Sequence, residues 1–163
     1  LAIALLCSIP GISRRAAEGI LAEIGLDMTR FPSAGHLASW AGMCPGNSES
    51  AGKRLSGKTR KGSPWLRVLL VEAAHAAAHT KNTYLSAQYH RLAARRGKKK
   101  AMVAVGHTIL VMIYHMLQQK KSYKELGGNY FDERERRDTE KRLVRRLENL
   151  GYHVELQPDT PAA

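Results

Sequence analysis

The sequence has few cysteines, few aromatic residues and no long hydrophobic run. Of its 163 residues only two are cysteine, and 6% are aromatic. Two cysteines are too few for a disulfide scaffold, and Cys7 and Cys44 are too widely spaced for a zinc site. No apolar stretch reaches the roughly 20 residues that a membrane span needs. These absences favour a reduced, cytoplasmic setting and no membrane partner.

The N-terminus lacks an initiator methionine and the basic segment of a secretory signal peptide. It opens as an apolar stretch, Leu1 to Ile9, that leads into Pro10-Gly11. We therefore expect a piece of a longer protein. Its length suffices for one medium domain, or two small ones, with a real core.

Acidic residues are almost absent from the middle of the chain. Lys and Arg number 26 against 14 Asp and Glu, a formal net charge of +12. Between residues 50 and 124 sixteen bases accompany a single acid, Glu72, whereas both flanks are slightly acidic. A local excess of this kind is typical of proteins that bind polyanions, so nucleic acid is the expected partner.

Apolar residues recur at helical spacing, which predicts an all-α, mainly helical fold. Capping and stop residues place the boundaries. Helices are expected over 14–25 (Ser13 cap, Gly25 stop), after Ser33, from Ser63-Pro64 through Trp65 to Ala77, and over 83–96, 101–117 and 132–150. We expect a helix-hairpin-helix and a following helix in 1–42, a helical bundle with a basic serine-bearing loop in 43–131, a charged helix and short tail strand in 132–156, and a disordered tail in 157–163.

Two short helices joined by the Pro10-Gly11 turn resemble a helix-hairpin-helix motif. In that motif the turn and the N-terminus of the second helix offer backbone N–H groups to a phosphate. The turn glycine allows close approach to the anion with an unusual φ. The candidate nucleic-acid contacts are Gly11, Ser13, Arg14 and Arg15. The alternative is a helical hairpin that only packs.

Residues 43–62 have no apolar periodicity and predict a long, functional loop. Ser48 and Ser50 lie in it among small residues. A serine hydroxyl is a weak nucleophile unless the developing charge is stabilised, and cations do this well on a phosphodiester. From the residues alone, a solvated loop that only grips phosphate is the simpler interpretation. The cations of this segment are Lys53, Arg54, Lys58, Arg60, Lys61 and Arg67.

A second basic run separates two apolar helices. Its position within the acid-poor middle favours contact with phosphates, although such runs are usually solvated faces. The run comprises Arg95, Arg96, Lys98, Lys99 and Lys100.

Several other polar side chains are expected to be structural. His75 and His79 have the spacing of metal ligands, but no carboxylate lies between them, so a packed or interface pair is favoured and no metal site is expected. Tyr89, Tyr114 and Tyr130 are interpreted as packing aromatics rather than nucleophiles. The charged helix over 132–150 carries an apolar strip, Leu143 to Leu150, that suits packing on the core or self-association.

Six sequence blocks in a fixed order resemble the C-terminal half of transposases of the insertion sequence 110 family (IS116/IS110/IS902 type), the bridge-RNA-guided recombinases. They include PGIS, FPSAGHLASWAGMCPG, SAGKRLSGKTRKGSPWLRVLLVEAA, YKELGGNYFD and RRLENLGYHVEL, and reach to about Leu156. The resemblance implies a serine recombinase-like domain whose nucleophile is Ser50, with Ser48 as the alternative. It also implies DNA and a structured guide RNA as partners, assembly of several protomers, and a bacterial or archaeal nucleoid setting. Lys53, Arg60 and Arg67 are the hypothesised stabilisers of the phosphorane-like charge.

The family's Mg²⁺-binding acids belong to an N-terminal domain that has no counterpart in this sequence. Asp27, Glu49 and Glu72 are scattered, so no cofactor is expected on this chain. We expect strand cleavage and rejoining from the full-length protein and not from this piece alone. A non-catalytic helix-hairpin-helix binding module is the main alternative, and a scaffold that assembles through 132–150 is a third.

Overall fold

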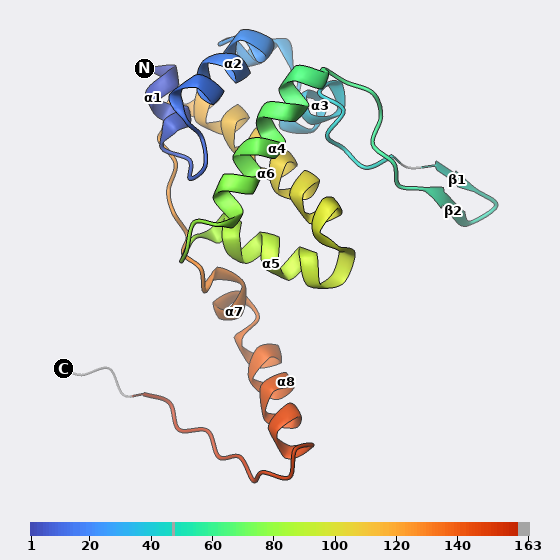
Figure 1. The fold of residues 1–163 in the computed structure, drawn as a ribbon, viewed down its shortest axis with the longest axis vertical. Helices are drawn as coiled ribbons and strands as arrows, with labels where there is room; N and C mark the ends of the chain where they lie inside the picture. The colour runs from blue at the N-terminus through green and yellow to red at the C-terminus, as the bar shows by residue number, and fades with distance from the viewer. Residues whose placement is uncertain (47, 160–163) are drawn as a thin grey trace.

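The computed structural model describes residues 1–46 and 48–159, and most of them form helices (Figure 1). The all-α expectation is confirmed, with one small β-hairpin added. In chain order the elements are α1 (Ala2–Cys7), α2 (Arg14–Ile24), the 3₁₀ helix η1 (Met28–Arg30), α3 (Ala34–Trp40), β1 (Ser48–Ser50), β2 (Lys53–Ser56), α4 (Pro64–Ala78), α5 (Tyr84–Arg96), α6 (Lys98–Gln119), α7 (Tyr130–Arg134) and α8 (Arg136–Glu148).

The helix boundaries follow the local capping signals. The hydroxyls of Ser13, Ser33 and Ser63 each accept a hydrogen bond from the backbone N–H three residues on, at 3.2, 3.4 and 3.2 Å. Gly25 and Gly97 end α2 and α5 with φ of +75° and +84°, where a side chain would be strained. The predicted caps and stops are therefore confirmed.

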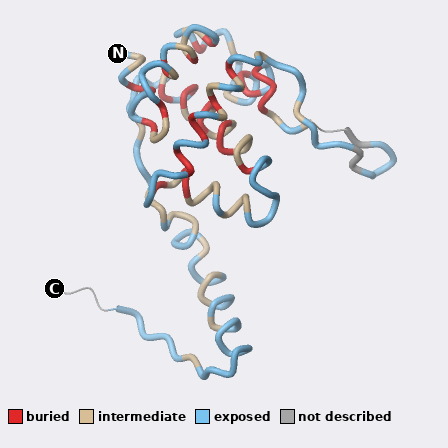
Figure 2. Tube along the Cα trace, in the orientation of Figure 1, coloured by how far each residue is buried: buried red, intermediate tan, exposed pale blue. Residues whose placement is uncertain are grey.

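The core is assembled around α6, which packs against α1, α3, α4 and α5. Figure 2 marks its buried residues in the middle of the helical body. Val105, Ile109 and Ile113 of α6 are fully buried, as is Leu70 of α4. Gly106 lets the two helices approach closely, because a Cβ there would lie 3.3 Å from the Leu70 carbonyl oxygen. By length and composition α6 could cross a membrane, but half of its most apolar stretch is buried in this core.

The helix expected over 132–150 is divided in two at Glu135. The Arg91 guanidinium on α5 donates to both carboxylate oxygens of Glu135 at 2.8 Å and lies over the Phe131 ring, 5.0 Å from its centre. The hydrogen bond from Arg91 holds the pKa of the Glu135 carboxyl below its usual value. At this long-range contact Glu135 has non-helical φ and ψ of −111° and 29°.

The predicted strand over 151–156 is wrong. Residues 152–159 have no regular secondary structure. A strand needs a neighbour to share its hydrogen bonds, and the tail runs away from the helical body (Figure 1). Of the tail expected to be disordered, 157–159 are irregular and 160–163 lie outside the described residues.

The C-terminal helix α8 forms an arm that leaves the helical body (Figure 1). Among the described elements it contacts only α7. Leu143 and Leu147 on α8 and Leu150 just after it are 50, 43 and 69% exposed. The apolar strip of α8 is therefore not packed on the core of its own chain.

Candidate active site and nucleic-acid interface

Ser50 lies at the tip of a β-hairpin, within the segment expected to be an irregular loop. β1 ends at Ser50 and β2 begins at Lys53, and these two residues are cross-strand partners. Ala51 and Gly52 between them have φ of +50° and +74°, the signs found in a two-residue type I′ turn. Opposed residues lie on the same face of a hairpin, so Ser50 and Lys53 are brought together, and both are exposed.

The other candidates on the hairpin are placed by strand register alone. Ser48 is opposite Ser56 and Arg54 is opposite Glu49, with an irregularity between the two pairs. The side chains of Ser48 and Arg54 lie outside the described part of the chain. Of the two candidate serines, Ser50 is therefore the one whose side chain is described, and it is exposed at the hairpin tip.

Glycines let the two legs of the hairpin approach each other at its base. The Gly46 N–H donates to the Lys58 carbonyl at 3.1 Å. A Cβ at Gly42 would lie 2.7 Å from the Arg60 carbonyl oxygen and from the Gly62 nitrogen. No side chain fits at this separation, so glycine at position 42 is what allows the two legs to meet at the base of the hairpin.

Arg67 ties this base to α4. Its Nη1 donates to Thr59 Oγ1 at 2.8 Å and to the Gly42 carbonyl at 3.3 Å, one contact on each leg. Arg60 lines a crevice of about 200 Å³ with Ser39 and Pro45 at the same end. Arg60 and Arg67 therefore lie at the base of the hairpin, whereas its tip projects beyond the helical body (Figure 1). Arg67 acts here as a positioning residue.

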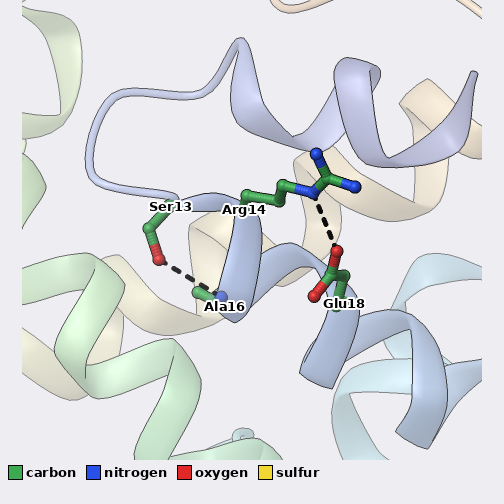
Figure 3. A network of polar contacts seen from close by, with 4 residues as sticks. All are labelled: Ser13, Arg14, Ala16 and Glu18. Atoms are coloured by element: carbon green, nitrogen blue, oxygen red, sulfur yellow. Dashed lines mark hydrogen bonds and ion pairs between the residues drawn. The ribbon is translucent and has the colours of Figure 1, made fainter.

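The turn between α1 and α2 is held against α4. Gly11 has φ of +92°, and a Cβ there would lie 2.6 Å from the Ala77 nitrogen. The glycine is required by this packing, a reason that differs from the expected approach to a phosphate. Figure 3 draws the start of α2, where Ser13 caps Ala16 and the Arg14 Nε lies 2.9 Å from Glu18 Oε1.

The second basic run forms a corner between two helices, which we call the basic corner (Arg95, Arg96, Lys98, Lys99 and Lys100). Arg95 and Arg96 end α5, Gly97 turns the chain, and the three lysines form the first turn of α6. The helix expected from Ala101 thus begins three residues earlier. All five side chains are exposed, and none forms an ion pair within the described residues. Lysines at a helix N-terminus oppose its dipole, so they do not stabilise α6.

The tyrosines and histidines take structural positions. Tyr114 is buried and its hydroxyl donates to the Phe31 carbonyl at 3.1 Å, while Tyr130 packs edge-on against Tyr84. The His75 and His79 rings lie 4.6 Å apart on the surface of α4. Burial lowers the pKa of His107. Nowhere in 1–46 and 48–159 do three or more His, Cys, Asp or Glu residues gather as a metal-ligand set.

Two features are not predicted by the sequence patterns above. Arg91 pairs with Glu135, 44 residues away, and no local pattern reveals such a contact. Helical spacing groups Trp65 with the apolar residues of its helix, yet it is 72% exposed. A signal is present, because the buried positions Leu66, Leu70 and Ala73 define a helical face from which Trp65 is displaced.

Comparisons with known proteins cover more than half of the chain. Residues 3–91 match the sequence profile of a family described as "Transposase IS116/IS110/IS902 family". The chain is 31% identical over 121 residues to a transposase for insertion sequence element IS1111A from Coxiella burnetii, covering 72% of this chain and 33% of that protein. It is 30% identical over 124 residues to an uncharacterized 43.6 kDa protein of insertion element IS110 from Streptomyces coelicolor, covering 74% of this chain and 30% of that protein. The chain thus spans about a third of the length of these two relatives.

Proposed function

Because the chain belongs to the IS116/IS110/IS902 family of transposases, we propose that it binds DNA through its basic middle segment and supplies Ser50 as the nucleophile for strand cleavage and rejoining during transposition. The observation that carries this proposal is the exposed Ser50–Lys53 pair at the hairpin tip. Residues 50–71, from the hairpin tip onward, contain six cations and no acid, and Glu49 precedes Ser50 on β1. The net positive charge of this segment favours approach to DNA.

The proposed chemistry is a direct displacement at phosphorus. The Ser50 Oγ attacks a phosphodiester, a new O–P bond forms, and the bond to one deoxyribose oxygen breaks. The hydroxyl proton passes to water, and the departing oxygen takes up a proton. Rejoining is the reverse, with a strand-end hydroxyl that displaces Ser50. Lys53 stabilises the charge on the equatorial oxygens.

Further charge stabilisation comes from outside the hairpin tip in this proposal. Arg67 donates to both legs at the base and holds the hairpin in place, and Arg60 lines the crevice at the same end, so neither lies beside Ser50 at the tip. The described residues do not fit Mg²⁺, since Asp27 and Glu72 lie on separate elements and no ligand set gathers. We assign any Mg²⁺ of the reaction to residues beyond this chain and derive no step from it.

A structured guide RNA is the second nucleic-acid partner that we propose. A-form RNA, like duplex DNA, is contacted largely through phosphates and sugars, so the exposed cations of the basic corner suit either nucleic acid. The corner is separate from the serine hairpin along the chain and on the body (Figure 1), so two nucleic-acid segments can be held at once.

Self-association through α8 completes the proposal. Within α8, residues 136–140 carry two acids and two bases and residues 141–148 carry one acid and four bases, so an antiparallel second copy keeps the two basic halves apart. The exposed stripe of Leu143, Leu147 and Leu150 then faces its counterpart. Leu147→Glu is expected to weaken self-association at least tenfold in sedimentation experiments. Arg137→Glu, off the stripe on the same helix, is the matched control, and equal effects of the two variants would contradict a leucine contact.

A non-catalytic binding module is the second candidate function. It is favoured by the distance of Arg60 and Arg67 from the tip, because Lys53 is then the cation that the structure places beside Ser50. This candidate predicts the same DNA affinity without a covalent intermediate.

The binding proposal is tested by removing the three lysines of the basic corner. Lys98→Gln/Lys99→Gln/Lys100→Gln is expected to weaken duplex DNA binding and to reduce the slope of log K against log salt by roughly 0.9 for each phosphate that the variant no longer neutralises. Its melting temperature is expected to stay level or rise, because lysines at a helix N-terminus oppose the dipole. Fluorescence anisotropy at several salt concentrations measures both affinity and slope.

The control removes charge from the opposite end of α6. Lys120→Gln/Lys121→Gln changes the net charge by two but lies outside the basic corner. This control variant should leave most of the slope of log K against log salt unchanged. If both variants reduce the slope in proportion to charge alone, binding is diffuse and the assignment to the basic corner fails.

A further inference from the structure

Trp65 is exposed in a place where a tryptophan gains nothing from folding. It lies in the first turn of α4 and is 72% exposed, although tryptophan is on average highly buried. Val68, one turn on, is 53% exposed. The other tryptophan, Trp40, is 49% exposed and packs against Phe31 with ring centres 5.6 Å apart. Trp65 has no aromatic partner among the described residues, so its indole face is available to a ligand.

A groove of about 430 Å³ adjoins this indole between α2 and α4. This volume lies in the range of small-ligand sites. Apolar atoms dominate its surface, and the polar groups lie at a few positions. Its lining residues are Ser13, Arg15, Ala16, Trp65, Val68, Leu69 and Glu72.

The two walls of the groove are fixed to each other. The Ser63 hydroxyl, at the start of α4, donates to Glu23 Oε2 on α2 at 2.7 Å. Farther along, Gly19 of α2 admits Leu69, because a Cβ at Gly19 would lie 2.7 Å from the leucine Cδ1. A hydrogen bond and a close packing contact thus hold the helices, so the groove exists before any ligand binds.

The polar groups on the groove indicate the class of occupant. The charged residues that line the groove are Arg15 and Glu72, one of each sign, beside the apolar Trp65 and Val68. An apolar peptide side chain would match the indole but leave Arg15 without an anion. A nucleotide matches both, since its base is a flat apolar surface and its phosphate is an anion. Only an unpaired base offers a free face for stacking.

We propose that the groove between α2 and α4 holds one unpaired base of single-stranded DNA, stacked on the Trp65 indole, with a neighbouring phosphate at Arg15. The Glu72 carboxylate on the groove accepts a hydrogen bond from an amino group of the base. The inference rests on the proposed function, because it assumes a DNA strand bound to the basic segment. It adds a site for melted or displaced DNA on α4, the helix that follows the serine hairpin in the chain.

Trp65 can be made its own reporter for the test. The chain has two tryptophans, so Trp40→Phe leaves Trp65 as the single indole fluorophore. We expect a single-stranded oligodeoxynucleotide to quench this emission upon binding. The same length of abasic DNA, which retains the phosphates, should bind but quench little. Trp65→Ala should lower single-strand affinity roughly 5- to 100-fold, as expected for loss of one base–aromatic stack. Trp65→Phe should recover most of it, and neither variant should change the salt slope.

The outcomes separate this inference from the proposed function. Steep salt dependence with unchanged affinity in Trp65→Ala overturns the stacking site and leaves DNA binding in place. Equal quenching by abasic DNA also overturns it. Quenching that grows with protein concentration and without DNA assigns the groove to a second copy of the chain, which again overturns it. Absence of salt-dependent binding overturns both proposals.

Discussion

Ser50→Ala is expected to lower DNA strand cleavage by the full-length protein by a factor on the order of 10⁴ or more, because the proposed covalent link forms on the Ser50 hydroxyl. DNA affinity should change less than twofold, since the hydroxyl carries no charge and the alanine at the tip leaves the hairpin intact. Single-turnover cleavage of a labelled duplex measures the rate, and anisotropy measures the affinity.

Two neighbouring variants calibrate this result. Ser48→Ala should retain cleavage within a few-fold, because Ser48 lies opposite Ser56 and away from the Lys53 partner. Lys53→Gln should reduce the rate roughly 100-fold, the size of effect seen when one group that stabilises transition-state charge is removed. Loss of cleavage in Ser48→Ala with retention in Ser50→Ala would move the nucleophile to Ser48.

Gly42→Ala is expected to have the largest effect on the position of the hairpin. Gly42 follows α3 with φ of +69°, and the next residue, Met43, donates its N–H to the Ala38 carbonyl at 2.9 Å. Alanine would be strained at this φ, and its Cβ would lie 2.7 Å from backbone atoms of the opposite leg. We expect a loss of about 2–4 kcal/mol in the free energy of unfolding, together with a large loss of cleavage. Chemical denaturation and single-turnover cleavage measure the two effects.

Gly127→Ala provides the matched control. Gly127 also has a positive φ, +86°, but a Cβ there would meet no atom within 4 Å. It isolates the conformational cost, about 1 kcal/mol, from the steric one. If Gly42→Ala costs no more than Gly127→Ala and preserves cleavage, the closely packed base does not position Ser50.

Features that depend on neighbouring residues were predictable from the sequence. Ser13, Ser33 and Ser63 cap helices through a bond to an N–H three residues away, and Gly25 and Gly97 end helices through their own φ. Both effects are local, so the pattern of letters suffices.

Features that depend on distant partners were not predictable. The hairpin in the segment 43–62 is held at its base by Arg67, whose contact with Gly42 spans 25 residues. Its turn, Ala51-Gly52, is a weaker signal than Asn-Gly, because alanine adopts positive φ reluctantly. Glu135 ends α7 at a contact with Arg91 on another helix, whereas its own neighbours favour a continuous helix.

The candidate site also combines local features with features that depend on distant residues. Two residues separate Lys53 from Ser50 in the sequence, and the strand register makes them cross-strand partners. Arg60 and Arg67 are also near in sequence, but the two legs carry them to the other end of the hairpin. Proximity along the chain therefore identified the neighbour of Ser50 at the tip. It did not reveal that Arg60 and Arg67 lie at the base of the hairpin.

The most direct measurement is the identity of the residue that becomes joined to DNA. The full-length protein is incubated with a nicked duplex that traps a covalent intermediate, and the linked peptide is sequenced by mass spectrometry. The account predicts a phosphodiester link to Ser50, absent in Ser50→Ala. A link to Ser48 or to a tyrosine, or intact DNA binding with no link at all, would contradict it.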